Sequence, residues 1–91
     1  MALESGAAQF EWLLLDNNTA LGDGAARVAR AAAHSRCLRC LSLEGCLLAA
    51  RQVADVLRAL RLGPAHTLEF LDLSRNILDS SALQELLSLL Q

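Results

Sequence analysis

The 91-residue chain contains no tyrosine and no lysine, and only 3% of its residues are aromatic. Its eight basic residues are outnumbered by ten acidic ones, so the net charge is -2 and no basic stripe marks a nucleic-acid surface. Apolar runs stay well below the ~18 residues that a membrane span needs. We therefore expect neither a nucleic acid nor a membrane as a partner.

The chain also has few cysteines, and its amino-terminal stretch does not resemble a secretory signal. Three cysteines are an odd number, which rules out a fully paired disulfide framework within one chain and favours a reducing, cytoplasmic environment. Glu4 and Glu11 interrupt the amino-terminal stretch, which has neither a basic start nor an apolar core. A secretory signal peptide is therefore not expected.

What the chain has in abundance is leucine and alanine, with 22 and 16 copies. Hydrophobic residues make up 54% of the sequence, enough for a packed core. The length allows one small domain.

Three windows repeat one spacing of apolar residues. They begin at Phe10, Leu38 and Leu68, and each follows the frame L-x-x-L-x-L-x-x-N/C. The ninth positions, which we expect to turn inward and satisfy backbone groups as a structural ladder, are Asn18, Cys46 and Asn76. Equivalent leucines are 28 and 30 positions apart, which predicts a repeated structural unit.

The segments Leu41-Ser-Leu-Glu-Gly-Cys46-Leu-Leu48 and Leu71-Asp-Leu-Ser-Arg-Asn76-Ile-Leu78 resemble the ribonuclease-inhibitor-like subclass of leucine-rich repeats. We expect an α/β solenoid of three strand–helix repeats, with parallel strands on a concave face and helices on a convex face. The repeats are expected at about 10–37, 38–67 and 68–91, after a short segment 1–9. The resemblance implies a module that binds another macromolecule, although the fold alone does not choose the partner.

Apolar residues at helical spacing predict a helix after each strand, at about 23–34, 50–61 and 81–90. Gly63-Pro64 is expected to end the second helix. In the third, Ser81 and Gln84 are expected to form a capping box. The leucines expected to face inward from that helix are Leu83, Leu86, Leu87 and Leu90.

Side chains alternate along a strand, so residues between the inward leucines should line the concave face. Three columns result: Trp12, Cys40 and Phe70; Leu14, Ser42 and Asp72; and Asp16, Glu44 and Ser74. We interpret them as a partner-binding surface with apolar anchors and an acidic rim without a facing base. Such a surface fits a protein partner that carries an apolar side chain beside arginine or lysine. The alternative is that both aromatic residues pack sideways on neighbouring parts of the chain.

Catalytic and metal sites have little support. Cys37 and Cys40 form a C-x-x-C pair, to which His34, Cys46 and His66 could add ligands, but the repeat register points the three cysteines in different directions. No G-x-S-x-G or other catalytic frame surrounds the serines. We expect a non-enzymatic protein without metal or cofactor.

The ends of the repeat array suggest a second function. A solenoid buries each repeat against the next, so both end faces should expose apolar surface that other repeats or subunits cover. The chain could then be a structural subunit, or a fragment of a larger assembly or longer solenoid. Its contacts would lie at the termini and on the convex helices, at Arg27, Arg51 and Arg58.

Overall fold

The computed structural model describes residues 10–63 and 67–89, and within them strands and helices alternate. Each strand is followed by one helix, which gives three strand–helix units, here called the first, middle and third unit. The elements are β1 (Trp12–Leu14), α1 (Gly24–His34), β2 (Cys40–Ser42), α2 (Ala50–Leu62), β3 (Phe70–Asp72) and α3 (Ser80–Leu89). The expected α/β class and the alternation of strand and helix are confirmed.

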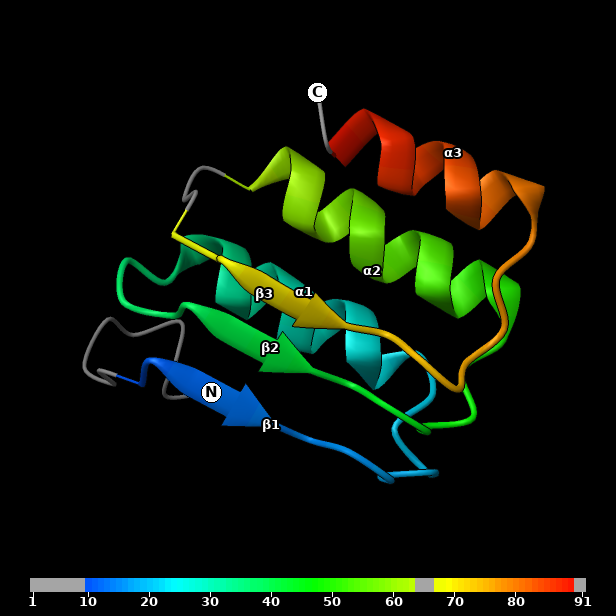
Figure 1. The fold of residues 1–91 in the computed structure, drawn as a ribbon, viewed down its shortest axis with the longest axis horizontal. Coiled ribbons are helices and arrows are strands. Elements are labelled where there is room, and N and C mark those ends of the chain that lie inside the picture. The colour runs from blue at the N-terminus through cyan, green and yellow to red at the C-terminus, as the bar shows by residue number, and fades with distance from the viewer. Residues whose placement is uncertain (1–9, 64–66, 90–91) are drawn as a thin grey trace.

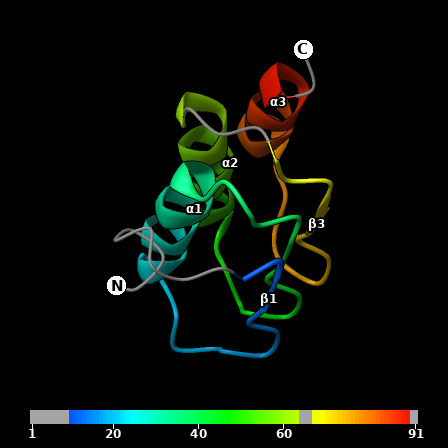
Figure 2. The ribbon, with the colours of Figure 1, turned by 90° about the vertical axis from the view of Figure 1, so that its left-hand side faces the viewer.

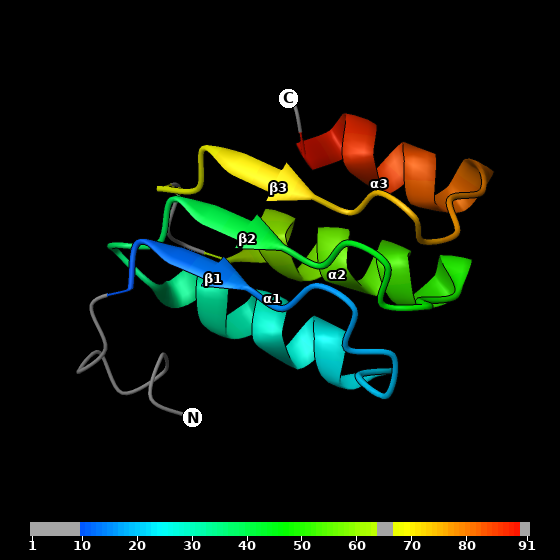
Figure 3. The ribbon, with the colours of Figure 1, turned by 60° about the horizontal axis from the view of Figure 1, so that its bottom comes forward.

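The three strands form one open parallel sheet in the order β1-β2-β3. The register places Trp12 beside Cys40 and Cys40 beside Phe70. Parallel neighbours need a crossover connection, and all three helices lie on the same side of the sheet (Figures 1 and 2). None of the described helices covers the other side, which we call the open sheet face (Figure 3).

The hydrophobic core is centred on the middle unit, which has a neighbouring unit on both sides. Leu41 and Leu43 are fully buried against Val53, Val56 and Leu57 of α2. Burial of each such side chain contributes about 1.5–3 kcal/mol. The equivalent leucines of the outer units are only half-buried: Leu13, Leu15, Leu71 and Leu73.

The junction after α2 requires a glycine. The helix ends at Leu62, and a Cβ on Gly63 would lie 2.1 Å from the Cβ of Ala33 in α1. Two covalently unconnected carbons cannot approach so closely, so only glycine lets the end of α2 pack on α1 here. Pro64, His66 and Leu90, and the segment 1–9, lie outside the described residues.

Helix α3 buries a different face from the one expected. Ala82 is fully buried and Leu86 and Leu89 pack on the core, whereas Leu83 and Leu87 are half exposed. The expected inward positions of Leu83 and Leu87 are therefore wrong. Helix α3 has one neighbouring helix, α2. It packs Ala82, Leu86 and Leu89 on the core, and Leu83 and Leu87 lie on its outer side.

The cap of α3 also differs from the expected Ser81 and Gln84 box. Asp79, immediately before the helix, accepts the Ala82 amide at 3.0 Å and the Ser81 hydroxyl at 2.9 Å. These two bonds hold the pKa of Asp79 below its usual range. A carboxylate at this place satisfies one of the amides that a helix start leaves unpaired.

All three units share a left-handed residue just before the ladder position. Asn17, Gly45 and Arg75 have φ values of 64°, 65° and 61°. Glycine and asparagine tolerate this conformation, whereas an arginine adopts it at a cost. The recurrence shows that the backbone turns in the same way after each strand.

Candidate functional site

The first column of the open sheet face forms a shallow pocket. Trp12 and Phe70 are 68% and 58% exposed, and Cys40 lies between them in the register. With neighbouring strands about 4.8 Å apart, the two aromatic residues stand roughly 10 Å from each other. A pocket of about 350 Å³ is lined by these three residues together with Arg39 and Glu69, and we call it the aromatic slot. The slot is wide enough for one aliphatic side chain.

Arg39 joins the three units at one end of the slot. Its guanidinium donates to Glu69 Oε1 at 2.8 Å and lies 3.6 Å from Glu11 Oε1. The hydrogen bond and charge of Glu69 raise the pKa of Arg39 further, so it stays cationic. Sequence reasoning missed this cluster, although aligning the windows places Glu11, Arg39 and Glu69 at one position in alternating charge.

The second and third columns contain internal hydrogen bonds. Asp16 Oδ1 accepts the Ser42 hydroxyl at 2.5 Å and the Glu44 amide at 3.0 Å, which ties the first unit to the middle one. Ser42 is buried, so its hydroxyl serves Asp16 and not the surface. Leu14, by contrast, is exposed beside the slot.

The acidic end of the open sheet face includes one base. Asp72 Oδ1 accepts the Ser74 hydroxyl at 2.5 Å and the Ser74 amide at 2.9 Å, and these bonds lower the pKa of Asp72. Asp72 is therefore anionic at neutral pH. Glu44 lies 3.8 Å from the guanidinium of Arg75. The expectation that no base faces the acidic residues is wrong at Glu44, because the left-handed turn brings Arg75 over it.

Two of the three ladder residues, Cys46 and Asn76, connect their unit to the one before it. Asn76 Oδ1 accepts the amides of Cys46 and Leu48 at 3.1 and 3.0 Å, and its Nδ2 donates to Leu43 O at 2.7 Å. Cys46 Sγ lies 3.2 Å from Leu15 O in the first unit. The expected inward position is wrong for Asn18, which is exposed and donates within its own unit, to Leu15 O at 2.6 Å.

The cysteines do not converge. Cys46 is buried in the ladder, Cys40 is half-buried under the aromatic slot, and Cys37 is half-buried before β2. Within residues 10–63 and 67–89 no three Cys, His, Asp or Glu side chains gather as a metal site would require. His66, one of the conceivable ligands, lies outside these residues.

Comparison of the chain with protein-family models, curated proteins and solved structures finds no match. None of the helices in the described part of the chain is long and apolar enough to cross a membrane.

Proposed function

We propose that the chain is a leucine-rich repeat solenoid segment that binds a protein partner through its open sheet face, without catalysis. Support comes from the three in-phase sequence windows, one parallel strand and one helix per window, and the ladder bonds of Asn76. The observation that carries the binding proposal is the exposure of Trp12 and Phe70 on either side of Cys40. Exposed aromatic residues around a pocket are typical of interface hot spots.

The charges beside the slot define the partner. Asp72 and Asp16 lie toward the other end of the strands from Arg39, so an extended partner segment meets apolar surface first and carboxylates next. Arg39 is already held between Glu11 and Glu69 and offers little to an acidic ligand. The partner therefore carries an aliphatic or aromatic side chain next to arginine or lysine.

A peptide library displayed on phage and selected on the purified chain tests this chemistry. We expect enriched peptides to contain an apolar residue beside a basic one. The affinity of an enriched peptide, measured by fluorescence anisotropy, should fall about 30-fold in the double variant Trp12→Ala and Phe70→Ala, as for loss of a hot spot of ~2 kcal/mol. Leu83→Ala, which removes an exposed apolar side chain from α3, should leave the affinity unchanged.

Substitution of Asp72 separates the charged contribution from the apolar one. Asp72→Asn removes the charge and keeps an acceptor for Ser74. We expect a few-fold loss of affinity and a weaker dependence on salt. Peptides that bind the double aromatic variant as tightly as the native chain would refute the proposed binding face.

A second candidate function is contact through the outer side of the third unit. Leu83 and Leu87 expose 50% and 53% of their surface on α3, and Ile77 and Leu78 are exposed nearby. A structural subunit would cover this apolar side with a neighbour. Cross-linking in the native source distinguishes the two functions, since contacts at α3 favour assembly and contacts at Trp12 and Phe70 favour recognition.

A further inference from the structure

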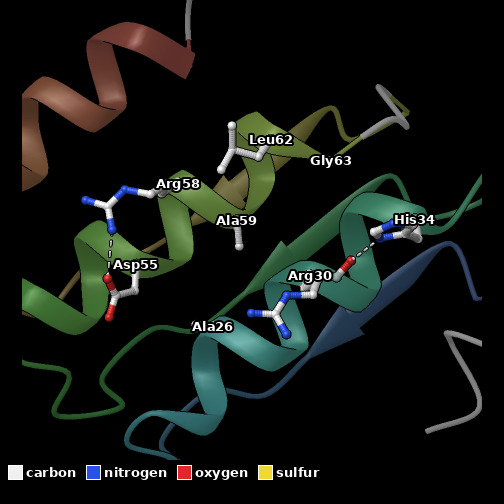
Figure 4. Close-up of a pocket in the computed structure, with 8 residues that line it drawn as sticks. All are labelled: Ala26, Arg30, His34, Asp55, Arg58, Ala59, Leu62 and Gly63. Carbon is white, nitrogen blue, oxygen red and sulfur yellow. Dashed lines mark hydrogen bonds and ion pairs between the residues drawn. The ribbon is translucent and has the colours of Figure 1, made fainter.

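A groove between α1 and α2 lies on the side of the molecule away from the open sheet face. It has a volume of about 420 Å³. Arg30 and His34 line it from α1, and Ala59 and Leu62 line it from α2 (Figure 4). Leu62 is 68% exposed. The groove therefore combines an apolar wall with a basic one.

Two arginines line the groove, Arg30 from α1 and Arg58 from α2, and they differ in their charge pairing. Arg51, Arg58 and Arg61 of α2 each lie within 3.4 Å of a carboxylate. Arg30 is exposed and has no acidic partner among the described residues, and the same holds for Arg27 one turn earlier. Helix α1 has no acidic residue of its own, so its outer face is a concentration of uncompensated positive charge in an acidic chain.

His34 and Asp55 contribute polar side chains to the groove. His34 Nδ1 lies 2.8 Å from Arg30 O, and a carbonyl only accepts, so Nδ1 carries a proton and donates to it. Asp55 also lines the groove, but its two oxygens are held by Arg51 at 3.4 Å and Arg58 at 3.1 Å. The one acidic side chain of the groove is thus neutralised, and Arg30 remains available.

We propose that this groove binds an acidic protein segment in which carboxylates flank an apolar side chain. The apolar side chain rests on Leu62 and Ala59, and a carboxylate pairs with Arg30, whose planar guanidinium suits bidentate contact. This chemistry is the reverse of that on the open sheet face, so the groove takes a different partner or a different part of the same one.

A protein segment fits this groove better than a nucleic acid or a membrane does. Duplex binding commonly uses about 6–10 phosphate contacts, far more than Arg27 and Arg30 can supply. Two arginines also provide only weak attraction to an anionic bilayer, at ~1 kcal/mol each. The apolar wall beside Arg30 would gain nothing from a phosphate backbone.

The experiment uses a soluble, fluorescein-labelled peptide with paired glutamates on both sides of one leucine, added to the full chain. Anisotropy should show binding that Arg30→Glu weakens about tenfold. The matched control is Arg36→Glu, which makes the same charge change at an exposed arginine outside the groove and should alter the affinity less than about twofold. A peptide with serine in place of leucine should bind more weakly.

Four outcomes would overturn the proposal. They are absence of binding, equal weakening by Arg30→Glu and Arg36→Glu, equal binding of a peptide with lysines in place of glutamates, and tighter Arg30-dependent binding to phosphatidylserine vesicles or duplex DNA. The double variant Trp12→Ala and Phe70→Ala should bind the acidic peptide normally. The proposal for the groove and the proposal for the open sheet face can therefore be refuted independently of each other.

Discussion

The middle unit and the two outer units share one sequence pattern but differ in how completely they are packed. Leu41 and Leu43 of the middle unit are fully buried, and their equivalents before and after are half-buried. The exposed Trp12 and Phe70 stand on the outer units, one on each side of the middle strand. The middle of the aromatic slot thus lies on the tightly packed middle unit, and its two aromatic sides belong to the less packed outer units.

The largest expected effect compares equivalent core leucines. Leu41→Ala leaves a cavity at a fully buried position and should lower the free energy of unfolding by about 2–5 kcal/mol. Leu71→Ala, at the equivalent half-buried position, should cost less than half as much. Urea unfolding monitored by circular dichroism measures both. Equal losses would mean that the third unit is packed as fully as the middle one.

The ladder offers the next comparison. Asn76→Ala leaves the amides of Cys46 and Leu48 without their acceptor and should cost about 2–3 kcal/mol. Asn18→Ala removes only local bonds at an exposed position and should cost less than about 1 kcal/mol. The same urea titration applies, and a larger loss at Asn18 would contradict the assigned direction of the ladder.

Substitutions at the left-handed turns should change the free energy of unfolding by less, and one of them should raise it. Arg75→Gly relieves a conformation with φ of 61° and should stabilise the chain by about 0.5–1 kcal/mol. Gly45→Ala should destabilise it, because φ is 65° and the new Cβ would lie 2.7 Å from Asn17 Oδ1. Thermal unfolding of the two variants, with Arg75→Ala as a control for the lost side chain, checks both signs.

The smallest expected effect is the loss, in acid, of the hydrogen bonds that Asp79 makes at the start of α3. The pKa of Asp79 is lowered in the folded chain, so its stabilisation of α3 is complete above the unfolded pKa of ~3.9 and is lost as the pH falls through the lower folded value. The melting temperatures of native chain and Asp79→Ala should differ at pH 6, and the difference should shrink as the pH falls below about 4.

The ladder residue Asn76 provides the uncharged control for this titration. Its Oδ1 accepts the amides of Cys46 and Leu48, and its Nδ2 donates to Leu43 O, so none of these bonds involves a carboxylate. The difference in melting temperature caused by Asn76→Ala should not converge in acid. A constant difference for Asp79→Ala across the same pH range would show that its carboxylate does not cap α3.

The sequence predicts the units well because leucine spacing directly encodes strand, turn and helix. The expected helices 23–34, 50–61 and 81–90 differ by one residue at most from the observed bounds. The buried face of α3 was mispredicted, since Leu83, Leu86 and Leu87 look alike in a periodic pattern. Which of them is buried depends on how many neighbours the helix has, and spacing alone does not carry that information.

The candidate site was only partly predictable for the same reason. Alternation along the strands gave the exposed positions of Trp12 and Phe70. It could not show that Ser42 is buried beneath Asp16, or that Arg75 reaches Glu44, because both depend on contacts between units. The groove beside Arg30 was missed because charge pairing across helices cannot be read from one helix.

The most direct test of the proposed function is amide chemical-shift mapping of the chain with a peptide selected from the phage library. We predict that the perturbed amides lie in β1, β2 and β3 and their flanking residues, with the largest shifts beside Trp12, Cys40 and Phe70. Shifts confined to the α1–α2 groove or to the outer side of α3, with the three strands unaffected, would contradict binding at the open sheet face.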